Sequence, residues 1–512
     1  MKGIIKKISK LPNWLLLSLT LPLLALSLSD KGGYILSKIE IPKVWTDEAM
    51  KTWELPNPKP EYSPQPVSEE YYYAMAERTI YRSYPVYHPD HEPEGYWEWL
   101  QSLEPEVVWD PSKFITEEDW IKAGEMLFDH PIDTLGAILT NNLVRNPDFY
   151  DYVEMPLTPE GIMPFSRWVV TGKGRVRVGN LSCGMCHTRV MPDGSLIKGA
   201  QGNWAGDKAS VFFATKEGFE PDNDLIRSMG FLMNALFGSP WSEGDPHGKL
   251  VSQGFDAIVK AFQSVPVGTF GRQGTSILFA PQAPDLIGVK DRKYLDHGGL
   301  GQHRGIEDMM RYIAMNQTLD VLNFYGDFSP LGIPRERLIP DRPIMFAGTH
   351  DRYSDEQLYA LSKYVYSLTP PENPNKPSAL SEKGKIIFAE QGCVTCHTPP
   401  LFTNNKLTPA EGFEIPEEHY EKYDIFDVFV GTDPNYTFNT RRSTGYYKIP
   451  SLKGLWYRGP YLHDGSISQL EDFFNHERLQ EGWLPKPIKG HEFGMYLTEG
   501  DRKALVAYLL TL

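Results

Sequence analysis

The sequence is short of positive charge. Lysine and arginine together number 51, against 66 aspartates and glutamates, which gives a formal net charge of −15 at pH 7. This balance argues against binding to nucleic acid or to an anionic membrane surface, because both select for basic patches. It favours a basic partner, which such a charge would attract from a distance.

One long apolar run occurs at the start of the chain, from Trp14 to Leu28, and it follows four lysines. The run is short for a membrane span and contains Pro22. The pattern predicts an export signal over residues 1–29, in which Ser27 and Ser29 offer small residues for cleavage. No Ala-x-Ala site follows, so an uncleaved N-terminal anchor stays open as the alternative. In either case we expect the rest of the chain in the periplasm or otherwise outside the cytoplasm.

Cysteine is also scarce, and all four cysteines of the 512 residues are used in two copies of the pentapeptide Cys-x-x-Cys-His. A c-type haem needs this pattern, because two thiols add across its two vinyl groups and the adjoining histidine ligates the iron. A dithiol redox pair, half a zinc site and a short disulfide loop do not require a histidine directly after the second cysteine, yet both copies have one. The predicted attachment residues are Cys183, Cys186, Cys393 and Cys396, with His187 and His397 as axial ligands.

The segments that follow the two motifs repeat each other. Each holds a Pro-x-Leu-x-Gly loop, a short acidic helix and a closing amphipathic helix with a hydroxyl cap. The repeat predicts two domains of the same kind in tandem. The matched pairs are 284–292 with 450–458, Tyr294-Leu295 and Gly298 with Tyr461-Leu462 and Gly465, 306–310 with 470–474, and 354–368 with 498–512.

We therefore expect a mainly α-helical protein of two tandem class I-like cytochrome c domains with long loops. The proline-rich run 369–377 separates the domains, and Thr116 is expected to cap the first helix of the first one. The predicted divisions are a signal peptide or anchor (1–29), an extended leader with an aromatic-rich helical accessory region (30–114), an N-terminal cytochrome domain (115–370) and a C-terminal cytochrome domain (378–512).

The second axial position of each haem decides whether it carries electrons or reacts. In single-haem cytochromes c that ligand lies on a loop before the closing helix. His491 fits for the C-terminal haem, since it precedes the Leu-Val-Ala-Tyr-Leu pattern at Leu505 by 505 minus 491, or fourteen, residues. His476 is the alternative, followed by Met495.

The N-terminal haem has no equally well placed ligand. His350 is the nearest loop histidine, but it lies three residues from the counterpart of His491, because the closing helices align at an offset of 512 minus 368, or 144. The sixth position is therefore His350, a neighbouring group such as Tyr312, or open.

Two further motifs carry a family resemblance, Gly-Pro-Tyr-Leu-His-Asp-Gly-Ser at 459–466 and Gly-His-Glu-Phe-Gly at 490–494. With the two haem motifs they resemble the bacterial di-haem cytochrome c peroxidase superfamily, which includes the peroxidases, MauG and the rubber oxygenases. The two motifs are 393 minus 187, or 206, positions apart. This wide spacing is closer to that of the rubber-oxygenase branch than to that of the compact peroxidases.

The resemblance implies that the N-terminal haem meets the oxidant while the C-terminal haem relays electrons. It also implies that His463 lies beside the second haem as a hydrogen-bonding group. Some relatives hold a calcium ion between the domains, so calcium is a further candidate cofactor. Haem propionates need cationic donors. The candidates for that role are Arg458, Arg441, Arg442 and Lys453.

The chain departs from the peroxidase pattern at the first haem. Peroxidases carry a histidine after the first motif, where this chain has Asn203. They also carry a distal glutamate that moves the peroxide proton, for which Glu243 is a loose candidate and His247 the local alternative. The resemblance therefore does not by itself secure peroxidase activity.

The sequence predicts an exported di-haem oxidoreductase that reacts with peroxide or dioxygen and exchanges electrons with a small redox protein. Two alternatives stay open, a non-catalytic periplasmic electron carrier with two six-coordinate haems and a haem-based sensory or structural protein. We expect membrane contact only through an uncleaved N-terminal segment.

Overall fold

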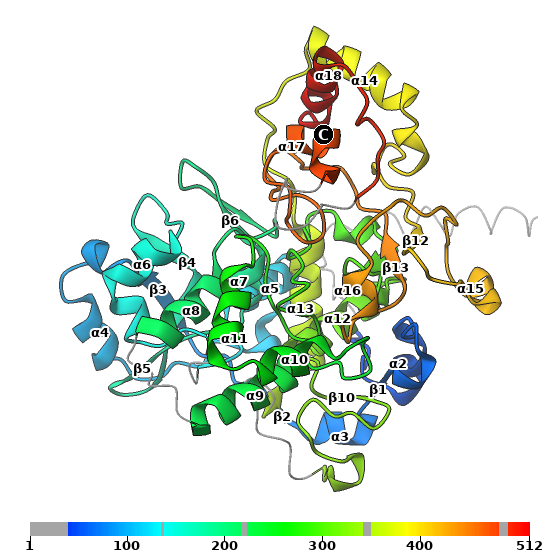
Figure 1. Cartoon of the computed structure of the whole chain (residues 1–512). Coiled ribbons are helices and arrows are strands. Elements are labelled where there is room, and N and C mark those ends of the chain that lie inside the picture. Colours follow the sequence, from blue (N-terminus) through cyan, green and yellow to red (C-terminus); the bar gives the residue numbers. More distant parts are fainter. Residues whose placement is uncertain (1–38, 135–137, 217–222, 341–349, 481–489) are drawn as a thin grey trace, which may run out of the picture. The chain divides into compact units, whose positions relative to one another are not determined.

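The computed structural model describes residues 39–134, 138–216, 223–340, 350–480 and 490–512. The predicted signal peptide or anchor, 1–29, lies outside them. Residues 42–512 form one compact unit, shown in Figure 1. Across the described ranges, no helix combines the length and the apolar character needed to cross a membrane.

Helices dominate this unit, as expected for a mainly α protein, and the strands form small sheets of two or three. The α-helices are α2 (Asp47–Trp53), α3 (Glu69–Ala74), α4 (Tyr96–Ser102), α5 (Glu117–Asp129), α6 (Pro147–Val153), α7 (Cys183–His187), α8 (Gly206–Lys216), α9 (Asn223–Phe237), α10 (Pro246–Ser252), α11 (Phe255–Gln263), α12 (Ile306–Gln317), α13 (Asp355–Ser367), α14 (Ala379–Glu390), α15 (Glu417–Lys422), α16 (Asn435–Phe438), α17 (Leu470–Phe473) and α18 (Glu499–Leu509).

The strands pair mostly across long stretches of sequence. β3, β4 and β5 form a three-stranded antiparallel sheet, and the remaining sheets are the pairs β1–β10, β2–β11, β6–β7, β8–β9 and β12–β13. The strands are β1 (Pro64–Pro66), β2 (Ala76–Glu77), β3 (Ser83–Tyr87), β4 (Ile162–Gly172), β5 (Arg175–Val178), β6 (Thr188–Val190), β7 (Leu196–Lys198), β8 (Tyr294–Leu295), β9 (Gly301–Gln302), β10 (Asn323–Tyr325), β11 (Asp351–Arg352), β12 (Leu407–Pro409) and β13 (Tyr446–Lys448).

The segment predicted to be an extended leader is folded from residue 42 onward, which corrects that prediction. Thr46 caps α2, and Trp45 and Trp53 are almost fully buried. Strand β1 pairs with β10, more than 250 positions along the chain. Burial of two large indole rings outweighs the extended preference of the prolines.

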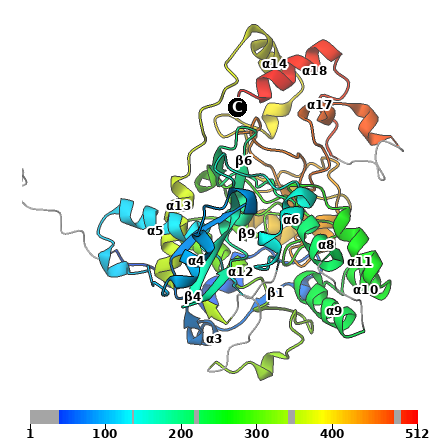
Figure 2. The same ribbon diagram turned by 90° about the vertical axis from the view of Figure 1, so that its left-hand side faces the viewer.

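Two helix pairs have the same close crossing, α5 with α13 and α14 with α18, and each pair lies side by side in Figures 1 and 2. A Cβ at Gly124 of α5 would overlap the Ala360 carbonyl oxygen, and one at Gly384 of α14 would overlap that of Ala504. Only glycine permits this approach of two helix backbones. Thr116 forms a capping box at the start of α5, as predicted.

Between segments 284–301 and 450–467 the backbone repeats itself at a constant offset of 450 minus 284, or 166. Asp296 and Leu462 both have positive φ, 65° and 63°, and the pair Leu295–Gly301 recurs as the bridge Tyr461–Ile467. The sequence match of Tyr294 with Tyr461, at offset 167, was wrong by one position. With the constant offset, His297 is the counterpart of His463.

Candidate haem sites

The N-terminal motif forms the short helix α7. The Ser182 side chain accepts a hydrogen bond from the Met185 N–H and caps this helix, which brings both thiols and the histidine to the wall of one cavity. The cavity has a volume of about 370 Å³. Its remaining wall is mainly apolar and comes from α8, α9, α11, α12 and the loop around Phe270.

This cavity fits a covalently bound haem. Burial raises the pKa of Cys183 to about 12 and that of Cys186 to about 11, so neither thiol ionises near neutral pH as a dithiol redox pair requires. Burial also lowers the pKa of His187 to about 4, so its imidazole is neutral, the form that ligates iron. An apolar wall around two thiols and one neutral imidazole suits a large flat cofactor.

Each motif histidine faces the carbonyl of the proline that opens its repeated loop. Nδ1 of His397 lies 3.1 Å from the Pro450 carbonyl oxygen. The Pro284 carbonyl raises the His187 pKa against the effect of burial, but Nδ1 of His187 has no hydrogen-bond partner within bonding distance among the described residues. A proton held on Nδ1 leaves Nε2 free for a metal. The contact with Pro450 therefore favours the ligating tautomer of His397.

The second histidine predicted for the C-terminal haem is buried. Burial, followed by the charge of His397, lowers the pKa of His491 to about 3, so its imidazole is neutral, the form that ligates iron. Its Nδ1 is buried without a hydrogen-bond partner among the described residues. Arg478 donates to the His491 carbonyl oxygen at 3.2 Å and to the Phe473 carbonyl oxygen at 2.9 Å, which holds the loop in place. The Phe473 ring packs edge-on against His491 at 5.0 Å.

The alternatives for that position are less well placed. His476 is exposed and stacks on Tyr496, with ring centroids 6.1 Å apart. Met495 is buried, and its N–H donates to the Glu492 carbonyl oxygen. His491 therefore stays the prediction for that position.

His350 lies away from the N-terminal cavity. Its side chain is 44% exposed, and its Nε2 lies 3.6 Å from an Asp351 oxygen. It is absent from the described residues that line the cavity, among which His187 is the sole histidine. The structure gives no support to His350 as an axial ligand. Tyr312, the other candidate, does line the cavity.

The residues suggested by the peroxidase pattern also lie outside the cavity lining. The Asn203 side chain bonds the backbone N–H and C=O of Val190, at 3.0 and 2.8 Å, and so has a structural role. Glu243 is exposed. His247 is buried and stacks on Phe237 at 5.8 Å, with a pKa lowered to about 4, chiefly by burial. This geometry supports neither Glu243 nor His247 as the group that moves a proton.

The structure places the residues expected beside the second haem, His463 and Arg458, in different surroundings. His463 lies against Tyr436 and Tyr447, and its carbonyl oxygen accepts a hydrogen bond from the Gln282 N–H at 2.7 Å. His463 therefore contacts these two tyrosines and Gln282. Arg458 donates to the backbone of its own loop, as described below.

The other three candidate propionate partners are less suitable. Arg441 donates to the last carbonyl groups of α9 and to Asp320 at 3.1 Å, so its donors are used. Arg442 donates to Asp296 at 2.6 Å. Lys453 is exposed.

A buried carboxylate network that the sequence did not reveal lines the cavity. Asp296 accepts hydrogen bonds from Arg272 at 3.0 Å, Arg442 at 2.6 Å, Tyr312 at 3.2 Å and Tyr436 at 2.9 Å. Burial alone would raise the pKa of Asp296, but the two guanidinium groups hold it well below its usual range. Asp296 is therefore a fixed negative charge that positions Tyr312.

Asp207 of α8 is a second carboxyl group on the cavity wall, and nothing in the sequence marked it. Its Oδ2 accepts one hydrogen bond, from the Gly271 N–H at 3.1 Å, and no cation among the described residues pairs with it. Burial raises its pKa to about 7. This carboxyl group can gain or lose a proton near neutral pH.

The calcium ion stays a prediction. In the ranges that the structure describes, no group of three or more histidine, cysteine, aspartate or glutamate side chains is arranged to hold a metal ion.

The fold and the two motifs define a c-type haem protein. No protein-family model matches the chain. Among curated proteins, the cytochrome c peroxidase IdrP1 of Denitromonas iodatirespirans is 28% identical, over 26% of this chain and 40% of that protein. The methylamine utilization protein MauG of Methylorubrum extorquens is 27% identical, over 26% of this chain and 34% of that protein. The match thus spans about two fifths or less of these relatives.

Two solved structures are similar at a low level. The diheme peroxidase BthA from Burkholderia thailandensis matches with a TM-score of 0.25 and 17% identity, over 57% of this chain and 86% of that one. A MauG-like protein associated with microbial copper homeostasis matches with a TM-score of 0.22 and 18% identity, over 31% and 56%. The sequence relatives, cytochrome c peroxidases and MauG, confirm the predicted resemblance, and with the two motifs they imply two c-type haems.

Proposed function

We propose that the protein is an exported di-haem oxidoreductase of two tandem cytochrome c domains. The haem at Cys183 and Cys186 would meet peroxide or dioxygen, and the haem at Cys393 and Cys396 would supply it with electrons. The curated relatives named as peroxidases and MauG support this class of reaction. The electron source would be a small redox protein, for which the net charge of −15 favours a basic surface.

The observation that carries the proposal is the difference between the two motif histidines. The charge of His397 reaches a second buried histidine, His491, and lowers its pKa. His187 opens onto a 370 Å³ cavity whose described lining contains no second histidine. Two strong ligands favour electron transfer, whereas an exchangeable position favours reaction with a small oxidant.

When bound, the haems would supply the iron that receives the oxidant and the electrons that reduce it. This chain would supply the proton transfer. Oδ1 of Asp207 accepts no hydrogen bond from the residues that the structure describes, so it could take a proton from hydrogen peroxide and return it to the departing hydroxide, which would leave as water. Asp296 cannot do this, because Arg272 and Arg442 keep it ionised.

Absorption and EPR spectra of the purified protein, as isolated and half reduced, test the proposal. We expect one low-spin haem and one haem that is high-spin or binds cyanide and carbon monoxide. Peroxide should change the second signal. Two low-spin signals unaffected by peroxide, cyanide and carbon monoxide would instead establish an electron carrier.

A further inference from the structure

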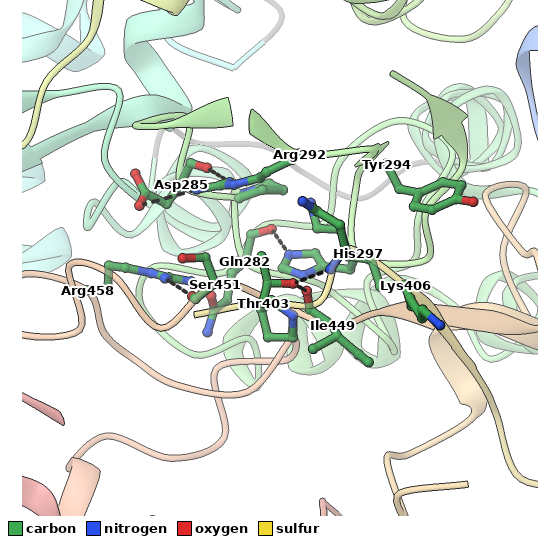
Figure 3. Close-up of a pocket in the computed structure, with 14 residues that line it drawn as sticks. Gln282, Asp285, Arg292, Tyr294, His297, Thr403, Lys406, Ile449, Ser451 and Arg458 are labelled. Atoms are coloured by element: carbon green, nitrogen blue, oxygen red, sulfur yellow. Dashed lines mark hydrogen bonds and ion pairs between the residues drawn. The ribbon is translucent and has the colours of Figure 1, made fainter. Parts of the chain in front are cut away.

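A small pocket of about 30 Å³ lies between the two repeats (Figure 3). The first repeat contributes Pro284 and Arg292 to its wall, and the second contributes Pro450 and Arg458. Both prolines are the ones whose carbonyl groups face the motif histidines. The pocket, which we call the inter-repeat pocket, therefore borders the histidine side of both haem sites.

The two arginines are held in the same way. Arg292 donates to the carbonyl oxygens of Asp285 and Ile287, and Arg458 donates to those of Ser451 and Lys453. Each acceptor pair is related by the offset of 166. The repeated loops thus direct one guanidinium group each to a common pocket, and backbone carbonyl groups do not neutralise these charges.

The inter-repeat pocket has an excess of positive charge. Lys448 and Lys406 join the two arginines in its wall, whereas Asp285 is its sole acid among the described lining residues. The Asp285 carboxylate is 3.9 Å from Arg292 and also accepts a hydrogen bond from the Tyr457 hydroxyl at 3.2 Å. No hydrogen bond or ion pair links the Lys448 ammonium group to the residues that the structure describes.

The cations of this pocket repel one another. Burial, followed by the charge of Arg292 and Arg458, lowers the pKa of Lys448 to about 7. The Nε of Arg458 is buried without a hydrogen-bond partner among the described residues. Asp296 and Asp285 offset part of this repulsion at Lys448. The pocket wall still holds four cations and one acid, and unbalanced buried charge is unfavourable, so the pocket favours a further anionic group.

We propose that the inter-repeat pocket binds the carboxylates of the haem propionates, one from each haem, and that Lys448 lies between them. This rests on the proposed function, which places a haem at each motif. Pro284, Asp285, Arg292 and Lys448 line both this pocket and the 370 Å³ cavity, so the two spaces adjoin. A volume of 30 Å³ has room for a few carboxylate oxygens.

One cation shared by two haems affects both of their reduction potentials. A positive charge favours the reduced state of each iron, which carries one positive charge less. Lys448 therefore raises both potentials together. A lysine that served only one haem would change one potential, and this difference makes the proposal testable.

Spectroelectrochemical titration of the full-length holoprotein measures the two potentials. We expect Lys448→Met to shift the oxidised-to-reduced equilibrium of both haems about tenfold toward the oxidised state, which is about 59 mV for a one-electron couple. Lys448→Arg keeps the charge and should leave both within about twofold. Lys453→Met removes an exposed charge outside the pocket lining and is the matched control. A shift of one potential alone, or of neither, overturns the proposal.

Two further measurements test which anion fills the pocket and how many haems the chain carries. In the wild-type protein, added phosphate at constant ionic strength should leave both potentials unchanged, whereas a saturable shift would show that a free anion fills the pocket. This titration of the wild-type protein tests the proposal even if the Lys448 variants fail to fold. A haem count other than two per chain would refute the proposed function itself, whereas two haems with unshifted potentials would refute only the role of Lys448.

Discussion

The two repeats share their histidine side and differ on the opposite side. Both place a proline carbonyl against the motif histidine and an arginine at the same loop position. In the C-terminal repeat the charge of His397 reaches the buried His491 and lowers its pKa. In the N-terminal repeat, α8 to α11 lie between the motif and the proline loop, and α8, α9 and α11 line a cavity. One scaffold can thus serve two tasks when the inserted segments differ.

The sharpest way to break this comparison is to remove one haem at a time. Cys393→Ala with Cys396→Ala should leave one covalent haem with the high-spin or exchangeable signal. Cys183→Ala with Cys186→Ala should leave one haem with the low-spin signal. Mass spectrometry counts the haems and EPR identifies them. The same spectrum from both double variants would show that the two sites are alike.

Removing the second imidazole should make the C-terminal site resemble the N-terminal one. We expect His491→Ala to abolish the low-spin signal of the C-terminal haem, because His397 would be its remaining histidine ligand. His476→Ala is the control and should leave the spectrum unchanged, since His476 is exposed. An unchanged spectrum in His491→Ala, with loss in the control, would reverse the assignment.

Asp207→Asn tests whether the N-terminal cavity moves protons. The asparagine keeps the size of the side chain but cannot accept the peroxide proton, so the rate of peroxide reaction should fall by roughly 10²- to 10⁴-fold. The raised pKa of about 7 means that the base form appears as the pH rises through 7. The wild-type rate should therefore increase across that range, and the variant rate should not.

Glu243→Gln is the matched control for that experiment. Glu243 is exposed, and the described cavity lining does not include it. Its substitution should leave both the rate and the pH profile unchanged. A larger loss in Glu243→Gln than in Asp207→Asn would return the role to the residue that the sequence first suggested.

The smallest expected effect concerns the helix crossings that the two repeats share. Gly384→Ala and Gly124→Ala each place a methyl group against a helix carbonyl, which should lower the free energy of unfolding by about 3 kcal/mol. Gly500→Ala of α18 has open space and should be neutral or stabilising by up to about 1 kcal/mol. Denaturant unfolding of the holoprotein measures all three. Equal effects would show that the crossings are looser than the structure indicates.

Local patterns predicted the parts of the fold that depend on neighbours in sequence. The capping residues Thr116, Ser354 and Thr498 begin the helices that were expected from them, since a cap acts over three residues. The repeated Pro-x-Leu-x-Gly loop was also visible. Its alignment slipped by one position at Tyr294, because identity of a side chain does not report backbone conformation as the matched φ values do.

Residues that act through long-range contacts were harder to find. Asp207 meets Gly271, and Asp296 meets Arg442 from the other repeat, so no sequence window contains both partners. Trp45 and Trp53 likewise show their burial only when the chain has folded around them. For the same reason the sequence could place the distal glutamate only loosely, at Glu243.

The sequence by itself predicted the two haem attachments, because thiol addition and iron ligation need five consecutive residues. It also predicted two repeated units, and His491 as the second axial ligand beside His397. Tertiary structure decided which carboxyl group faces the N-terminal cavity and which cations meet between the repeats. Those choices depend on burial and on charges brought together from distant segments, and both arise only when the chain is packed.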